Sequence, residues 1–336
     1  MASHRDIAAR FAQEAGKLNA QLLRARSGNV LVSPFDDRDL CSYGTHFVLA
    51  RIMLDEHGHR SWWLLNGDTY SVSTSGHQRL VREECGKTVL PVLIVPFSCL
   101  REARIDRDTI TPIDIQDESF ETVTHYAHEW DSVPEHAHYS ARLLPDGRYE
   151  WHTYRHWLGA SLFRAAYTVR EAGEYRTRTA YFLSAFDEQE TRPHYFLCEL
   201  PHGAAPASVG EAFEALKPPE VKRAETDGLT CTRQGDVFAV PTTLTTRQVS
   251  RLAHKRQRGV HVLHLSHTAT EVAVTDDGTT YARGILRHAP PGHGRQPEHK
   301  RQPMGDRKTW HRLVKNTVPL DERGDSRAWS RGGNVD

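Results

Sequence analysis

The dipeptide Asp277-Gly278 is the feature of this sequence that most narrows what the chain can fold into. It lies between Thr270–Thr275 and Thr280–Leu286, two segments with the composition of β-strands. An Asp-Gly pair between two such segments is typical of a β-hairpin with a two-residue type I′ turn. The two segments are therefore predicted to be antiparallel strands.

This hairpin also predicts which residues face each other across the two strands. With the dipeptide in the turn, the register places His267 directly opposite His288 and Glu271 opposite Gly284. Directly opposed residues have Cβ atoms about 4.5–5.5 Å apart, so two imidazoles in these positions can bind the same ion. The hairpin therefore suggests a site for one divalent transition metal.

A third ligand for such a metal has to come from outside the hairpin. His299 is the candidate, so the predicted metal ligands are His267, His288 and His299, with His311 as an alternative third ligand. The competing interpretation is that these histidines are solvated strand ends or hydrogen-bond partners of backbone carbonyls, which requires no metal. Both interpretations stay open.

The sequence around the hairpin also has the character of strands. Asp236–Val240, Val260–Ser266 and Trp310–Lys315 have this character, and no helix of ordinary length is evident between residues 255 and 318. Residues 226–318 are therefore predicted to form a small, all-β, histidine-rich basic module. The polar tail, residues 319–336, is rich in Gly, Arg and Ser and is predicted to be disordered.

The charges of the chain are unevenly distributed. Residues 251–336 hold 16 lysines and arginines against 9 aspartates and glutamates, whereas residues 1–250 hold 27 against 34. The formal net charge of zero therefore hides a basic end, which also contains eight of the 21 histidines. A local excess of cations is typical of a surface that binds phosphate groups or nucleic acid.

The basic residues of this end define a candidate surface for nucleic acid or another polyanion. Cations bind the phosphates, and an aromatic side chain such as Trp310 or Tyr281 stacks on a base. The competing interpretation is an ordinary solvated surface. The candidate residues are Lys255, Arg256, Arg258, Lys300, Arg301, Lys308, Trp310 and Arg312.

The N-terminal part is predicted to mix helices with antiparallel hairpins. A stripe of apolar residues predicts an amphipathic helix over residues 3–27, capped at its first residue. Thr45–Leu54 and Ser61–Leu65 are predicted to form a hairpin. Ser75-Gly76-His77-Gln78 has the spacing of a capping box, which predicts the start of a second helix at Ser75.

Apolar residues at helical spacing in Trp157–Val169 predict a helix in the middle of the chain, and Lys217–Gly228 is the best candidate for a linker. The fold class is predicted to be α+β. The predicted divisions are an α+β region at 1–128, a hairpin-plus-helix region at 129–225, the β-module at 226–318 and the tail at 319–336.

The sequence contains no complete catalytic motif. It lacks the nucleophile elbow, the phosphate-binding loop and the dinucleotide-binding glycine pattern, so whether the chain is an enzyme stays open. No apolar run approaches the ~20 residues that cross a bilayer, and the N-terminus shows no apolar signal region. We therefore expect a cytoplasmic protein with no membrane partner.

Several strings of residues resemble those of a known group of proteins. They are Cys41–Phe47, Asn66–Ser71, Ser73–Gln78, Tyr181–Glu188 and Tyr195–Pro201. The chain resembles, over residues 30–315, a group of uncharacterised proteins encoded by actinobacterial phages, plasmids and neighbouring genomes. This resemblance implies one inherited unit associated with a mobile element, and it implies no activity.

The last module also resembles a class of small β-rich proteins of unknown function. These proteins begin with the string Arg233-Gln234-Gly235-Asp236 and continue with a histidine-containing hairpin. They carry a Gly-His-x-His loop where this chain has His264-Leu265-Ser266-His267, and this departure weakens any metal site implied by the resemblance.

Three functions are therefore compatible with the sequence. The first is a mobile-element-associated protein whose C-terminal module binds nucleic acid or another polyanion. The second is a metal-dependent hydrolase that uses the cross-strand histidines. The third is a structural or interaction protein of a phage or plasmid, which would act through a protein partner.

Overall fold

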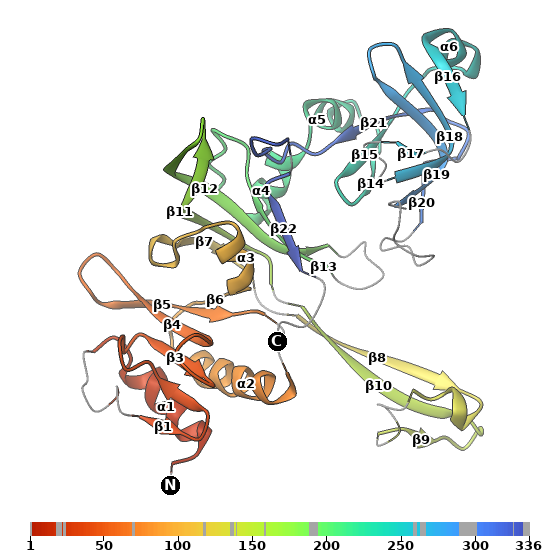
Figure 1. The fold of residues 1–336 in the computed structure, drawn as a ribbon. Helices are drawn as coiled ribbons and strands as arrows, with labels where there is room; N and C mark the ends of the chain where they lie inside the picture. The colour runs from red at the N-terminus through yellow and green to blue at the C-terminus, as the bar shows by residue number, and fades with distance from the viewer. Residues whose placement is uncertain are drawn as a thin grey trace. The chain divides into compact units, whose positions relative to one another are not determined.

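The computed structural model contains helices and mixed β-sheets, which confirms the predicted α+β class (Figure 1). It describes residues 2–17, 22, 25–68, 71–116, 119–134, 138, 140–157, 159–187, 194–257, 261–262, 267–288, 301–324 and 326–331. The chain forms two compact units, one of residues 1–115 with 161–336 and one of residues 116–160. The sequence-based boundaries after residues 128 and 225 stay predictions.

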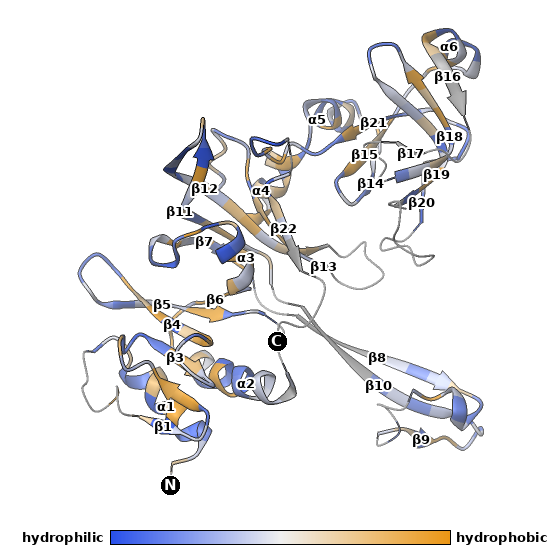
Figure 2. Cartoon of the chain, in the orientation of Figure 1, coloured by the Kyte–Doolittle hydropathy of each residue, from blue (hydrophilic) through white to orange (hydrophobic). Residues whose placement is uncertain are grey.

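The N-terminal sheet has six strands in sequence order, and the first five are antiparallel. The predicted hairpin is confirmed, with Ile52 opposite Trp63. The last strand runs parallel to its neighbour because helix α2 (Val72–Gly86) makes the crossover that a parallel pair needs. Figure 2 shows β6, with the sequence Val-Leu-Ile-Val, in the hydrophobic colour. The strands are β1 (Arg26–Ser27), β2 (Val30–Val32), β3 (Asp39–Ser42), β4 (Val48–Leu54), β5 (Arg60–Asn66) and β6 (Val92–Val95).

Helix α1 (His4–Glu14) starts where the sequence predicts and ends earlier. Ser3 forms a capping box, in which its Oγ accepts from the N–H of Asp6 at 3.1 Å and its own N–H donates to the Asp6 carboxylate at 2.7 Å. The predicted extension to residue 27 is wrong. Gly16 has a φ of +74°, and a Cβ at this position would lie 3.0 Å from Leu54, so the chain turns here and packs closely on β4.

Helix α2 begins before the position that its sequence pattern indicates. Ser71 is the N-cap, and the N–H of Ser75 donates to the carbonyl of Ser71 at 2.9 Å, so Ser75 lies inside the first turns of the helix. The predicted capping box at Ser75 is therefore wrong. His77 of this helix is buried, and its Nδ1 lies 2.8 Å from the Oγ of Ser42 on β3.

A second sheet has the order β22-β13-β12-β11-β7. The predicted helix at Trp157–Val169 is wrong, because residues from Ser161 onward form a strand that pairs with β12 over its whole length. This sheet and the first share one core, in which Leu64, Leu100, Phe163 and Phe182 are buried together. The elements here are α3 (Phe97–Glu102), the 3-10 helix η2 (Arg107–Thr109), β7 (Thr111–Ile115), β11 (Ser161–Glu171), β12 (Glu174–Asp187), β13 (His194–Glu199) and β22 (Ala328–Arg331).

Strand β22 lies in the tail that the sequence predicts to be disordered. Trp329 pairs with Leu197 of β13 and packs against the shared core. Arg327, just before the strand, forms an ion pair with Glu199 at 3.0 Å. The prediction of disorder is therefore wrong for residues 328–331.

The C-terminal part begins with helices α4 (Val209–Leu216) and α5 (Pro219–Thr226), and α5 fills most of the predicted linker. An antiparallel sheet follows in the order β14-β15-β21-β19-β18-β16, with β17 on β18 and β20 on β19. The predicted β-rich character holds, with one short helix, α6 (Thr246–Leu252), added to it. The strands are β14 (Thr232–Gln234), β15 (Val237–Pro241), β16 (Ala253–Gln257), β17 (His261–Val262), β18 (His267–Thr275), β19 (Thr280–His288), β20 (Gln302–Pro303) and β21 (His311–Lys315).

The unit of residues 116–160 is a β-hairpin with a small core of its own. Trp151 and Val133 are buried, and the ring of His125 stacks on Trp151 with centroids 5.3 Å apart. Its elements are β8 (Ser119–Ala127), the 3-10 helix η3 (Trp130–Ser132), β9 (Arg142–Leu143) and β10 (Tyr149–Trp157). Among the described residues of the whole chain, no helix has the length and hydrophobicity to cross a membrane.

Candidate functional site

The β18–β19 hairpin has a three-residue turn. Thr275 and Thr279 close it, because the N–H of Thr275 donates to the carbonyl of Thr279 at 3.0 Å. Gly278 has a φ of +82°, which fits a type I turn followed by a left-handed residue. The prediction of a two-residue type I′ turn is therefore wrong, although the hairpin itself is present.

A β-bulge further along the hairpin restores the predicted pairing. Near the turn the register is shifted by one residue, so Glu271 lies opposite Arg283 and not opposite Gly284. The register shifts back between Ala269 and Glu271. Beyond the bulge, His267 lies directly opposite His288, as the sequence predicts.

The structure describes the side chain of only one of the two opposed histidines. The side chain of His267 is buried, with 1% of the residue exposed. The side chain of His288, and the whole of His299, lie outside the residues that the structure describes. Among the side chains that are described, no group of three His, Cys, Asp or Glu residues is arranged to hold a metal ion. The opposed register is confirmed, and metal binding stays a prediction.

His311 does not serve as the alternative third ligand. It lies opposite Ala282 on β19, six residues before His288, and six strand residues span about 20 Å at ~3.3 Å per residue. Its Nδ1 lies 2.9 Å from the carbonyl of Thr309, and burial lowers the pKa of the His311 imidazole. His311 is therefore a buried, neutral histidine of the core.

Trp310 is not available to stack on a base, which corrects the predicted polyanion-binding set. It is 1% exposed and packs with Val249 of α6 and Ala273 of β18. The guanidinium of Arg283 lies over its ring, 4.9 Å from the centroid. The indole is therefore part of the packing between α6 and the sheet.

The remaining predicted cations differ in their surroundings. Arg312 is half-buried and forms an ion pair with Glu220 of α5 at 3.5 Å. Arg301 and Lys308 are exposed, and neither has an ion pair with a described residue. Four predicted cations have side chains outside the described part of the chain: Lys255, Arg256, Arg258 and Lys300.

Arg287 is an exposed cation that the sequence analysis does not single out. Strand β20 pairs with β19 so that Leu286 lies opposite Gln302. Continuing this antiparallel register by one residue places Arg301 beside Arg287, on the same face of the sheet. Directly opposed side chains have Cβ atoms about 4.5–5.5 Å apart, and two like charges at this distance destabilise the pair. An anion bound between the two arginines would relieve this repulsion.

Two further cations follow in the turn after β20. Arg307 and Lys308 are exposed, and Asp306 is directed toward the backbone, where it accepts from the N–H groups of Lys308 and Thr309 at 2.8 Å. These backbone N–H groups lower the pKa of Asp306. We call Arg287, Arg301, Arg307 and Lys308 the β19–β20 basic surface. Its charges make no ion pair with any described residue.

Comparison with known proteins does not assign the chain to a family. No protein-family model matches it, and neither the curated proteins nor the solved structures include a significant match. The assignment of function therefore depends on the geometry of the chain itself.

Proposed function

We propose that the C-terminal module binds nucleic acid through the β19–β20 basic surface. The observation that carries this proposal is the pairing of Leu286 with Gln302, because this register, continued by one residue, places the exposed Arg301 beside the exposed Arg287. Neither cation has an acidic partner among the described residues. Phosphate oxygens are the natural ligands of closely spaced arginines, because the planar guanidinium matches their geometry.

The contacts would be made with the phosphate backbone and not with bases. Trp310 is buried, so the described part of the basic surface offers no tryptophan on which a base can stack. Binding that depends on phosphates alone is independent of sequence and decreases strongly with salt. We therefore expect similar affinity for unrelated duplex sequences.

The experiment is a fluorescence-anisotropy titration of the full chain against a labelled DNA duplex of arbitrary sequence. The variant Arg287→Ala/Arg301→Ala should bind more weakly than the wild type. Arg312→Ala is the matched control, since Arg312 belongs to the same module but is half-buried and paired with Glu220. Equal affinity of the double variant and the wild type would contradict the proposal.

A second candidate function has one observation in its favour. His267 and His288 are directly opposed, which is the geometry that a shared metal ion requires. With His299 as the third ligand, a bound divalent metal would activate a water molecule for hydrolysis. This candidate predicts metal in the purified protein, whereas nucleic-acid binding through arginines does not require it.

The resemblance to proteins of actinobacterial phages and plasmids adds a biological setting to the proposal. A basic module of this kind would suit a mobile-element protein that acts on nucleic acid in the cytoplasm. A purely structural role with a protein partner is the remaining alternative, and it predicts neither salt-dependent DNA binding nor bound metal.

A further inference from the structure

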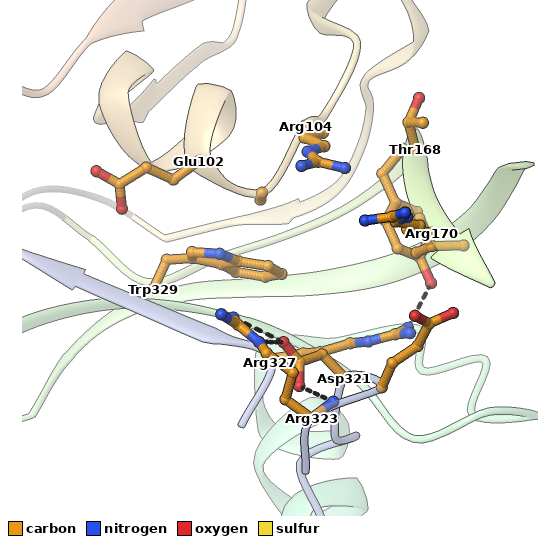
Figure 3. Close-up of a pocket in the computed structure, with 12 residues that line it drawn as sticks. Glu102, Arg104, Thr168, Arg170, Asp321, Arg323, Arg327 and Trp329 are labelled. Atoms are coloured by element: carbon orange, nitrogen blue, oxygen red, sulfur yellow. Dashed lines mark hydrogen bonds and ion pairs between the residues drawn. The ribbon is translucent and has the colours of Figure 1, made fainter. Parts of the chain in front are cut away.

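A cavity of about 440 Å³ lies within the larger unit (Figure 3). Three segments that are far apart in the sequence surround it: the end of α3, strand β11 and the segment that leads into β22. The volume lies in the range of sites that bind small molecules. The residues that matter for its chemistry are Glu102, Arg104, Arg170, Glu322, Arg327 and Trp329.

Arg327 is held rigidly at the base of this cavity. Its Nη1 donates to the hydroxyl of Tyr167 at 3.0 Å and to the buried carboxylate of Glu199 at 3.0 Å. The Tyr167 hydroxyl itself donates to Glu199 at 2.7 Å, and burial raises the pKa of Tyr167. These bonds all use one nitrogen of the guanidinium, and its other N–H groups make no hydrogen bond with a described residue.

Arg104 has a backbone conformation that an arginine does not favour. It follows α3 with a φ of +54°, in a turn where the N–H of Ile105 donates to the carbonyl of Leu100 at 2.8 Å. Glycine is the usual residue at this position of a helix end, because a Cβ is strained in the left-handed conformation. Strained residues are often found at ligand sites, so an arginine in this conformation at the edge of a cavity is a candidate for ligand binding. Its guanidinium is positioned over the ring of Tyr175, 5.2 Å from the centroid.

The cavity has a positive side. The N–H of Thr168 donates to the carbonyl of Arg104 at 3.1 Å, which joins the end of α3 to β11 and brings Arg104 close to Arg170. Figure 3 shows Arg104 and Arg170 around the same space, with the carboxylate of Glu102 directed away from Arg104. Neither arginine has an ion pair with a described residue, and both are exposed.

Some of the remaining charges near the cavity are compensated. Asp321 accepts from Arg323 at 3.0 Å, and Glu199 compensates Arg327. Glu102 and Glu322 are the two lining acids that form no ion pair with a described residue, and the Glu102 carboxylate is directed away from Arg104. The lining holds four arginines against three acidic residues, with Arg104 and Arg170 on its β11 side, and this small excess of positive charge favours an anion there.

Trp329 gives the cavity a flat apolar side. Its indole is half-buried on β22, with its ring 6.4 Å from that of Phe182 in the core. Figure 3 shows the ring along one side of the space. An aromatic ring that packs on the core with one side and faces a cavity with the other is suited to stack on a planar group.

We propose that this cavity binds a small anion that carries a planar ring, of the class of a nucleoside monophosphate. Arg104 and Arg170 bind the phosphate, Trp329 stacks on the base, and the free N–H groups of Arg327 donate to the polar groups between them. This site shares no residue with the β19–β20 basic surface. A negative result for one proposal therefore does not contradict the other.

The test is isothermal titration calorimetry of the full chain with 5′-AMP, with adenosine and inorganic phosphate as separate ligands. AMP should bind more tightly than either, because only AMP has both the ring and the phosphate. Arg104→Gly and Arg170→Ala should each weaken AMP binding at least ~10-fold, as expected when an arginine–phosphate contact is lost. Arg164→Ala is the control, because Arg164 is an exposed arginine on the same strand that does not line the cavity.

Arg104→Gly also separates binding from folding. Glycine accommodates the left-handed conformation, so this variant should keep or raise the melting temperature while it loses affinity for AMP. Wild-type affinity for AMP in Arg104→Gly would overturn the proposal, as would AMP binding no tighter than phosphate or an absence of heat at millimolar AMP. Arg287→Ala/Arg301→Ala should bind AMP like the wild type, which distinguishes this site from the nucleic-acid surface.

Discussion

Thr270 on β18 lies so close to Gly284 on β19 that a Cβ at Gly284 would be 2.5 Å from the Cβ of Thr270. Gly284 has a φ of +93°, and the Thr270 hydroxyl accepts from the N–H of Ile285 at 3.0 Å. This is the bulge that restores the register in which His267 and His288 are opposed. The pairing of the histidines therefore depends on a glycine that is not part of the site.

Gly284→Ala should lower the free energy of unfolding by more than the ~1–2 kcal/mol that a left-handed alanine costs. The added methyl group has to displace Thr270 as well as adopt a positive φ. Gly278→Ala is the matched control, because Gly278 also has a positive φ but has open space around it. Urea unfolding of both variants measures the difference, and equal destabilisation would show that Thr270 does not restrict position 284.

The histidine pair makes a prediction about metal content. If His267 and His288 share an ion, His267→Ala should remove one equivalent of transition metal from protein purified without chelator. His311→Ala should retain it, since His311 is a buried histidine of β21 that lies opposite Ala282, about 20 Å along β19 from His288. Elemental mass spectrometry measures the content directly. Metal that persists in His267→Ala would exclude this site.

The ion pair between Arg327 and Glu199 should stabilise the attachment of the C-terminal strand. Glu199→Gln removes the buried carboxylate that compensates the half-buried Arg327, and the expected cost is about 3 kcal/mol. Glu171→Gln removes an ion pair with Arg178 that is more exposed than the Arg327–Glu199 pair, and should cost less than ~1 kcal/mol. Denaturant unfolding compares the two, and similar losses would contradict a buried role for Glu199.

The stability of the N-terminal sheet should depend on pH through His77. Burial and the neighbouring His4 lower the pKa of His77, so the folded chain favours its neutral form. The contribution is fully present above the unfolded pKa of about 6.5 and is lost as the pH falls from there through the lowered folded pKa. His77→Gln should therefore reduce the loss of stability between about pH 6.5 and 5. The stability of His77→Gln and of the wild type is compared by urea unfolding at several pH values, and an equal loss in both between about pH 6.5 and 5 would contradict the role of His77.

The existence of the C-terminal hairpin could be predicted because its signal is local. The strands and the Asp277-Gly278 dipeptide lie within one short segment, and local pairing needs no distant partner. The turn type and the β-bulge could not be predicted from this local signal. Two shifts of one residue, at the turn and at Gly284, cancel each other, so the opposition of His267 and His288 is right although the intermediate pairing of Glu271 is wrong.

Features that depend on distant partners were not accessible from the sequence. Trp310 has basic neighbours in the chain, but α6 and β18 bury it. Strand β22 has four residues, and its partner β13 precedes it by well over one hundred positions. Arg287 has no Lys or Arg within three residues of it in the sequence. It becomes part of a basic surface only because the β19–β20 register, continued by one residue, places Arg301 beside it.

The central claim is tested most directly by the salt dependence of DNA binding, measured by fluorescence anisotropy between about 50 and 200 mM salt. Four cations on duplex phosphates predict a slope of log K against log salt of about −3 to −4, at roughly −0.9 per phosphate. In Arg287→Ala/Arg301→Ala the slope should become less steep by about 2, whereas Arg312→Ala should keep the wild-type slope. Salt-independent binding, or no binding of the wild type at low salt, would contradict the account.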